Sequence, residues 1–185
     1  MKGHVLLLSG VPGVGKSSVL RKVKQLLAGR RLRGFLTDEV RSARGQRLGF
    51  QIESFDGRTA RLADISSRSP HRIGRYGVDL GALERFALPA LALDERAVYL
   101  VDEIAKMECL SSAFVEAVVR LLDSGRPLIA TVAQRGEGFI ADVKRHPDAE
   151  LWQVMRETRD ELPARIVRWL EGSPFNPSVG GTTGN

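Results

Sequence analysis

The stretch "HVLLLSGVPGVGKSSVL", residues 4–20, decides the fold class of this chain. Its first half is a short apolar run that ends at Gly10, a pattern typical of a buried strand. From residue 17 to residue 28 the apolar residues recur at the spacing of one helical face, and Gly29 can end that helix. Between the two lies "GVPGVGKS", Gly10–Ser17, which matches the pattern G-x-x-x-x-G-K-[ST] in full. A strand, a glycine-rich loop and a helix in this order predict a phosphate-binding loop.

The residue types of this loop explain its chemistry. Gly10, Gly13 and Gly15 allow backbone conformations in which successive N–H groups point into one concavity that can hold phosphate oxygens. The positive end of the following helix adds to the attraction. Lys16 can reach the β- and γ-phosphates, and the Ser17 hydroxyl can ligate Mg²⁺. The residues predicted to contact nucleotide are Gly10, Val11, Pro12, Gly13, Val14, Gly15, Lys16, Ser17 and Ser18.

A second motif places two carboxylates at the end of an apolar strand. In "VYLVDEIAKME", residues 98–108, four apolar residues are followed by Asp102 and Glu103. Burying unpaired charges is costly, so two adjacent carboxylates at the end of a buried strand indicate a functional role. Beside a phosphate loop, Asp102 can hold Mg²⁺, while Glu103, on the other side of the strand end, can orient and deprotonate the attacking water. Taken without the phosphate loop, the pair could equally be solvated residues where a strand enters a loop.

The rest of the chain alternates between strand and helix patterns. Strands are predicted at residues 31–40, 97–103, 126–136 and 149–155, and helices at 79–91, 111–122, 138–146 and 160–172. Residues 46–65 alternate apolar and polar side chains around the turn signal Asp56–Gly57, which predicts an inserted β-hairpin, and residues 66–78 are expected to form a basic loop. We therefore expect an α/β fold with a largely parallel sheet and helices on both faces, built as a single domain over residues 1–171, and a disordered tail at 172–185.

Composition excludes several other classes. One cysteine among 185 residues rules out a disulfide framework or a multi-cysteine metal site within the chain, and fits a reducing, cytoplasmic environment. No apolar run approaches the roughly 18 residues of a membrane span, so no membrane partner is expected. Residues 1–85 carry 17 Lys/Arg and 7 Asp/Glu, a net charge of +10, which could attract nucleic acid or simply nucleotide phosphates. No aromatic residues interleave with these arginines as a stacking platform for single strands would require.

Several stretches resemble one family, the THEP-type nucleoside-triphosphatases, which are also called cancer-related nucleoside-triphosphatases. They are "GVPGVGKSS", "GFLTDEVRSARGQRLGFQIESFDG", "RIGRYGVDLGALERFALPAL", "VDEIAKME" and "RDELPARIVRWL", which together span most of residues 3–170 in order. The resemblance implies a RecA-like P-loop core, Mg²⁺ dependence and slow hydrolysis of several nucleoside triphosphates. It assigns Gly10–Ser17 to the phosphates, and Asp102 and Glu103 to the metal and the water. The chain departs from the family pattern at Ala105, where glycine is usual, but keeps every proposed catalytic group.

Efficient hydrolysis also calls for a cation that stabilises charge on the γ-phosphate. Arg159 is the first candidate, because "RETRDEL" resembles the "ENR" segment of the family, and Arg135, just after the strand "LIATVA", is the second. Each could instead be an ordinary surface arginine. Thr131 or Gln134 could sense the γ-phosphate or serve in a turn, and the basic segment 61–75 could close over nucleotide as a lid.

The sequence as a whole predicts a Mg²⁺-dependent nucleoside-triphosphatase that hydrolyses ATP, GTP and other nucleoside triphosphates to diphosphate and phosphate. Loose base preference is expected because there is no Asn-Lys-x-Asp segment to read guanine. One alternative is a nucleotide or nucleoside kinase in which residues 30–75 bind the acceptor. Another is a nucleic-acid-associated ATPase that uses the basic half. Neither the oligomeric state nor the physiological substrate follows from the sequence.

Overall fold

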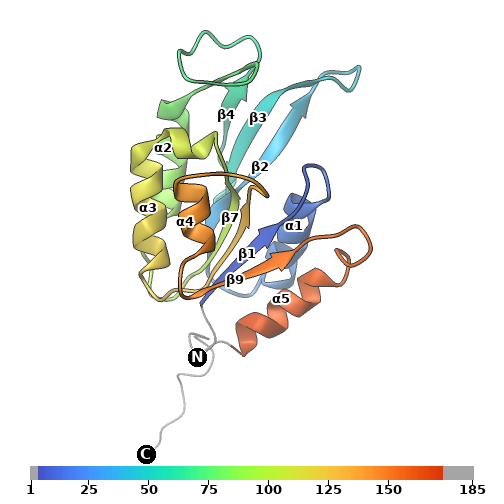
Figure 1. Ribbon diagram of the computed structural model, residues 1–185, viewed down its shortest axis with the longest axis vertical. Coiled ribbons are helices and arrows are strands. Elements are labelled where there is room, and N and C mark those ends of the chain that lie inside the picture. The colour runs from blue at the N-terminus through green and yellow to red at the C-terminus, as the bar shows by residue number, and fades with distance from the viewer. Residues whose placement is uncertain (1–3, 173–185) are drawn as a thin grey trace, which may run out of the picture.

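Residues 4–172, which the computed structural model describes, build one nine-stranded sheet with helices on both of its faces (Figure 1). The strand order is β5-β6-β4-β3-β2-β7-β8-β1-β9. The strands are β1 (Val5–Ser9), β2 (Leu32–Arg41), β3 (Arg47–Ser54), β4 (Thr59–Asp64), β5 (Arg72–Ile73), β6 (Tyr76–Val78), β7 (Val98–Ile104), β8 (Leu128–Val132) and β9 (Ala149–Gln153). The helices are α1 (Lys16–Leu26), α2 (Leu80–Ala90), η1 (Glu108–Leu110), α3 (Ser112–Leu122), α4 (Phe139–Lys144) and α5 (Leu162–Glu171).

The sheet has a parallel half and an antiparallel half. Strands β2, β7, β8, β1 and β9 are parallel neighbours, whereas β3, β4, β6 and β5 continue the sheet from β2 with antiparallel pairing. The predicted α/β fold with helices on both faces of the sheet is thereby confirmed. Because the carboxyl ends of parallel strands meet at one edge of a sheet, the residues that follow β1, β7 and β8 come together there.

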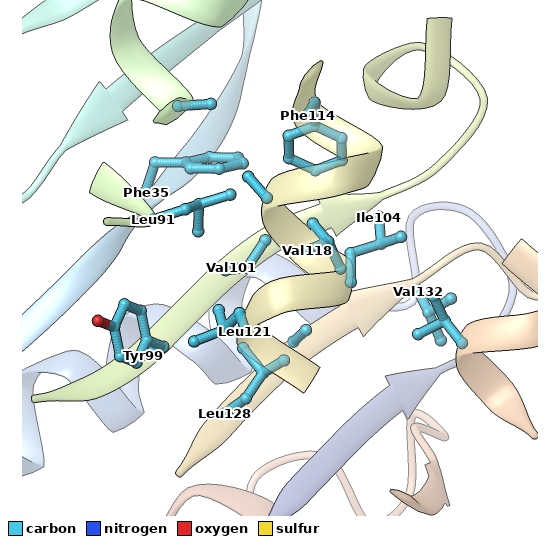
Figure 2. Packing of buried hydrophobic residues seen from close by; sticks show 14 of the residues in the cluster. Phe35, Leu91, Tyr99, Val101, Ile104, Phe114, Val118, Leu121, Leu128 and Val132 are labelled. Atoms are coloured by element: carbon cyan, nitrogen blue, oxygen red, sulfur yellow. The ribbon is translucent and has the colours of Figure 1, made fainter. Parts of the chain in front are cut away.

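Alternation along the central strands creates two cores. In β1, Val5 and Leu7 belong to a core on one face of the sheet that also includes residues of α2, α3 and α4. Leu6 and Leu8 belong to the core on the other face, which they share with α1 and α5. Figure 2 shows part of the first core, where Phe114, Val118 and Leu121 of α3 face β7 and β8. A strand covered on both faces needs apolar residues at every position, which explains its continuous apolar run.

Helix capping follows the sequence closely. The side chain of Asp79 accepts a hydrogen bond from the backbone N–H of Ala82 at 2.8 Å and so caps the start of α2. Ser111 caps α3 in the same way through the N–H of Phe114. Pro89 lies inside the last turn of α2, and the helix ends one residue later.

The segment around residues 46–78 differs in part from the prediction. The expected hairpin is present as β3 and β4, joined through Gly57 at φ +85°, but β3 also pairs with β2 and so extends the main sheet. The predicted basic loop 66–78 was wrong in part, because it contains the short strands β5 and β6. Strands of two and three residues are too short to show a period of two in the sequence. Of the predicted tail, residues 173–185 lie outside the described residues. No helix within the described part of the chain is both long and apolar enough to cross a membrane.

Candidate active site

The loop between β1 and α1 has the backbone shape that its sequence predicts. Gly13 and Gly15 adopt φ values of +77° and +107°, a region that residues with a Cβ rarely occupy. Gly10 lies so close to its neighbours that an added Cβ would approach the carbonyl oxygen of Val154 to 2.8 Å. The side chain of Val14 is buried in the core formed with α1 and α5, which anchors the loop. The loop is therefore fixed at Val14 while its glycines keep the backbone open to the cavity.

Helix α1 presents its positive end to this cavity. The helix begins at Lys16, its N-cap is Gly15, and neither a side-chain cap nor an acidic residue satisfies its first turn. The first N–H groups of a helix have no partner within the helix, and the helix dipole adds partial positive charge there. An uncapped helix start behind a glycine loop is a binding site for an anion such as phosphate.

A cavity of about 920 Å³, here called the phosphate cavity, opens over the loop. Its lining residues are Gly10, Pro12, Gly13, Gly15, Lys16, Ser17, Ser18, Thr37, Asp38, Glu39, Arg41, Arg47, Phe50, Glu103, Ala105, Ala133, Gln134 and Arg135. Seven of the nine loop residues predicted to contact nucleotide are among them; Val11 and Val14 are not. Ala105, where the family pattern has glycine, is also part of the wall.

Lys16 and Glu103 lie next to each other on the wall of the phosphate cavity. The Lys16 Nζ lies 3.4 Å from Glu103 Oε1 and donates a hydrogen bond of 3.2 Å to the carbonyl oxygen of Gly10. The two side chains come from α1 and β7, which are far apart in the sequence. The tertiary structure thus places the predicted phosphate-binding lysine beside the predicted base.

Asp102 lies behind the cavity wall and is held by hydroxyl groups from both neighbouring strands. It is 1% exposed. Its Oδ1 accepts a hydrogen bond from Thr131 of β8, and its Oδ2 accepts one of 3.3 Å from the hydroxyl of Thr37 of β2. Thr131 was predicted as a possible γ-phosphate sensor, but it is fully buried and its hydroxyl contacts Asp102. Thr37 could not be predicted as a partner of Asp102, since nothing in the sequence shows which strand will lie beside β7.

The surroundings of Glu103 suit a proton acceptor. Burial raises the pKa of Glu103, the positive charge of Lys16 partly offsets this rise, and the negative charge of Asp102 adds to it. A carboxylate with a raised pKa is a stronger base than an ordinary exposed glutamate, which is what proton abstraction near neutral pH requires.

The two candidate arginines occupy different places. Arg159 lies against the phosphate loop, where its Nη1 donates a hydrogen bond of 3.0 Å to the carbonyl oxygen of Val14 and its guanidinium packs over Gly15. Arg135, the second choice, lines the phosphate cavity, as does Gln134. The structure therefore brings Arg159 to the loop and Arg135 to the space that Glu103 faces.

Many arginines of the basic half are engaged in ion pairs. Arg41 and Arg47, both on the cavity wall, pair with Glu39, and Arg21 pairs with Asp38. An arginine that is neutralised by a carboxylate contributes less to binding a nucleic-acid backbone than a free one. These pairs do not favour the nucleic-acid alternative.

A second space, here called the side cavity, adjoins the phosphate cavity and measures about 250 Å³. The residues common to both cavities are Thr37, Phe50, Glu103, Ala105, Ala133 and Arg135, and those of the side cavity alone are Leu62, Ile73, Lys106, Met107 and Glu108. Glu108 is 4% exposed, and its Oε2 has no hydrogen-bond partner among residues 4–172. The sequence analysis did not single out Glu108, because a carboxylate in a short 3₁₀ turn gives no sign of its burial.

Known proteins match almost the whole chain. Residues 5–167 match the family described as NTPase. The chain is 36% identical to nucleoside-triphosphatase THEP1 of Thermotoga petrophila over 97% of this chain and 98% of that protein. It is 32% identical to the cancer-related nucleoside-triphosphatase of Homo sapiens over 94% of this chain and 99% of that protein. The crystal structure of THEP1 from Aquifex aeolicus superposes with a TM-score of 0.83 at 31% identity, and the match covers 90% of this chain and 99% of that one.

Proposed function

The chain belongs to the NTPase family, whose relatives include THEP1 and the cancer-related nucleoside-triphosphatases, and from this premise we propose that it hydrolyses ATP, GTP and other nucleoside triphosphates with Mg²⁺ and little base preference. Nucleoside-triphosphatase activity itself is the activity of the family. The observation that carries the proposal is the 3.4 Å pair of Lys16 and Glu103, which lies on the wall of the cavity over the phosphate loop.

Binding of the triphosphate rests on the loop and on the start of α1. The backbone N–H groups around Gly13 and Gly15, the uncapped first turn of α1 and the Lys16 ammonium all favour negative charge in the same space. Phosphates there would pair with the Lys16 ammonium, since Lys16 lines the same cavity. Since these contacts are made to phosphates, every nucleoside triphosphate can make them, which supports loose base preference.

The residues near Asp102 fit a magnesium ion. Mg²⁺ prefers oxygen ligands, and in nucleotide sites it is held by one or two protein groups together with phosphates and water. The buried carboxylate of Asp102, fixed by Thr37 and Thr131, and the hydroxyl of Ser17 on the cavity wall are such groups. Groups of three or more His, Cys, Asp or Glu side chains that could hold a metal are absent from residues 4–172. When bound, Mg²⁺ would neutralise charge on the β- and γ-phosphates.

Glu103 then performs the proton transfer. A water molecule attacks the γ-phosphorus, its proton passes to the Glu103 carboxylate, and the bond between the γ-phosphorus and the β–γ bridging oxygen breaks. The raised pKa of Glu103 makes it a competent acceptor for that proton. Lys16 and Arg135 are the cations positioned to stabilise the charge that develops on the transferred group.

The test is phosphate release from ATP, GTP, CTP and UTP with Mg²⁺, run for the parent protein and for Glu103→Gln. General-base catalysis contributes on the order of 10²–10⁴-fold, so the variant should lose that much turnover while it still binds nucleotide. Glu116→Gln is the matched control, because Glu116 is an exposed glutamate of α3 outside both cavities. Equal turnover by Glu103→Gln would refute the role of Glu103. Release from one triphosphate alone would refute the broad specificity.

A further inference from the structure

The side cavity lies where a second substrate would have to lie. It shares Glu103 and Arg135 with the phosphate cavity, so it opens onto two of the groups that face the γ-phosphate in the function proposed above. Its position at the carboxyl ends of β2, β7 and β8 is the place where ligands bind in parallel α/β sheets. A molecule in this cavity would stand next to the transferred phosphoryl group.

The antiparallel half of the sheet builds the outer wall of this cavity. Phe50 comes from β3, Leu62 from β4 and Ile73 from β5, and all three strands lie beyond the parallel half that carries the phosphate loop. Met107 closes the cavity from the segment after β7. Water alone would not need an apolar wall, and the phosphate loop, Lys16 and Glu103 do not depend on it for their contacts. The wall therefore points to a ligand with apolar ring faces.

The size and the polar groups of the cavity narrow the class of ligand. Its volume of about 250 Å³ lies just below the range of roughly 300–1,000 Å³ typical of pockets for drug-sized ligands, which fits a molecule with one or two rings. Glu108 forms part of the wall and has an oxygen without a hydrogen-bond partner among the described residues, a group that a polar ring edge could satisfy. Arg135 lines both cavities and Lys106 lines the side cavity alone, so both add positive charge to its wall.

We propose that the side cavity binds a nucleoside, and that the primary hydroxyl of this nucleoside accepts the γ-phosphoryl group of a triphosphate held by the phosphate loop. This activity rests on the triphosphate site proposed above. The hydroxyl oxygen forms a bond to the γ-phosphorus, the bond from the γ-phosphorus to the bridging oxygen breaks, and its electron pair leaves with the nucleoside diphosphate. The hydroxyl proton goes to Glu103. When the side cavity holds no nucleoside, Glu103 instead accepts the proton of the attacking water. The products are a nucleoside diphosphate and a nucleoside monophosphate.

The protein is incubated with ATP labelled at the γ-phosphorus, Mg²⁺ and, in separate reactions, adenosine, guanosine, cytidine, uridine or thymidine. The label is then measured in nucleoside monophosphate and in inorganic phosphate. We expect label in the monophosphate of at least one nucleoside at a rate at least tenfold above its release as inorganic phosphate. Calorimetric titration of each nucleoside into the protein with ADP measures binding without turnover. Complete absence of triphosphate turnover would refute the proposed function, and the titration would still decide whether the cavity binds a nucleoside.

Two variants link the activity to the cavity. Ile73→Trp places an indole ring into the side cavity from β5, a two-residue strand at the edge of the sheet. The variant should lower nucleoside affinity at least tenfold, and it should lower the ratio of phosphoryl transfer to phosphate release by at least the same factor. Leu93→Trp, at a side chain that is 57% exposed and outside both cavities, is the control and should match the parent protein. Hydrolysis with neither binding nor labelling of any of the five nucleosides would overturn the proposal. So would transfer that survives Ile73→Trp with its ratio unchanged.

Discussion

The buried carboxyl of Glu108 makes a quantitative prediction about stability and pH. Burial raises the pKa of Glu108 from 4.5 to about 8, backbone hydrogen bonds oppose this rise in part, and the negative charges of Glu103 and Asp102 add to it. Lys106 and Arg135, the cations on the wall of the same cavity, do not cancel the effect of burial. The folded protein therefore keeps this proton at neutral pH, whereas the unfolded chain has lost it.

The sign and size of the effect follow from linkage. Below pH 4.5 Glu108 is neutral in both states and makes no pH-dependent contribution to stability. Between about pH 4.5 and pH 8 the folded state binds the proton that the unfolded state releases, so each pH unit lowers the free energy of unfolding by about 1.4 kcal/mol. Above pH 8 both states are ionised and the loss stops growing. Between pH 5 and pH 8 the contribution of Glu108 therefore falls by up to about 4 kcal/mol, a large share of the roughly 5–15 kcal/mol that holds an ordinary domain together.

Glu108→Gln removes this proton linkage and keeps the shape of the side chain. Urea unfolding of the parent protein and of the variant at pH 5, 6, 7 and 8 gives two curves of unfolding free energy, and their difference isolates Glu108 from all other titrating groups. We expect the variant to gain stability relative to the parent as the pH rises, by about 1.4 kcal/mol per unit. Glu116→Gln, at an exposed position, should give a flat difference. Parallel curves for the parent and Glu108→Gln would refute the conclusion that Glu108 is protonated in the folded protein.

Three further predictions concern the phosphate site. Lys16→Ala should lower triphosphate hydrolysis by at least about 10²-fold in single-turnover assays, because it removes the cation that contacts Glu103; turnover within a factor of two of the parent would contradict this. Thr131→Val should cost about 1–3 kcal/mol in urea unfolding, because it leaves an oxygen of the buried Asp102 carboxylate without its donor, and it should weaken Mg²⁺ binding by calorimetry. Arg159→Ala should raise KM with little change in kcat, because Arg159 holds the loop at the carbonyl oxygen of Val14 and does not line the phosphate cavity; a kcat lowered tenfold or more would assign it to the γ-phosphate.

The sequence by itself determined the fold class and the location of the phosphate loop. An eight-residue pattern between a strand and a helix specifies its own local geometry, because Gly13 and Gly15 must adopt positive φ and the helix start must follow at Lys16. The continuous apolar strands likewise required helices on both faces of the sheet. The adjacent carboxylates could also be assigned to a functional site from the sequence, because burying unpaired charges at the end of an apolar strand is costly.

Only the tertiary structure decided which side chains surround those carboxylates. Thr37 reaches Asp102 because β2 lies beside β7, and Thr131 reaches it because β8 lies on the other side, an order that local patterns do not encode. The strands β5 and β6 were missed because they are too short to show a period, and they matter because β5 supplies Ile73 to the side cavity. The burial of Glu108 is likewise a property of packing between distant segments. Hydrogen bonds and apolar contacts within a segment follow its own sequence, whereas a cavity is formed by residues that only the complete sheet brings together.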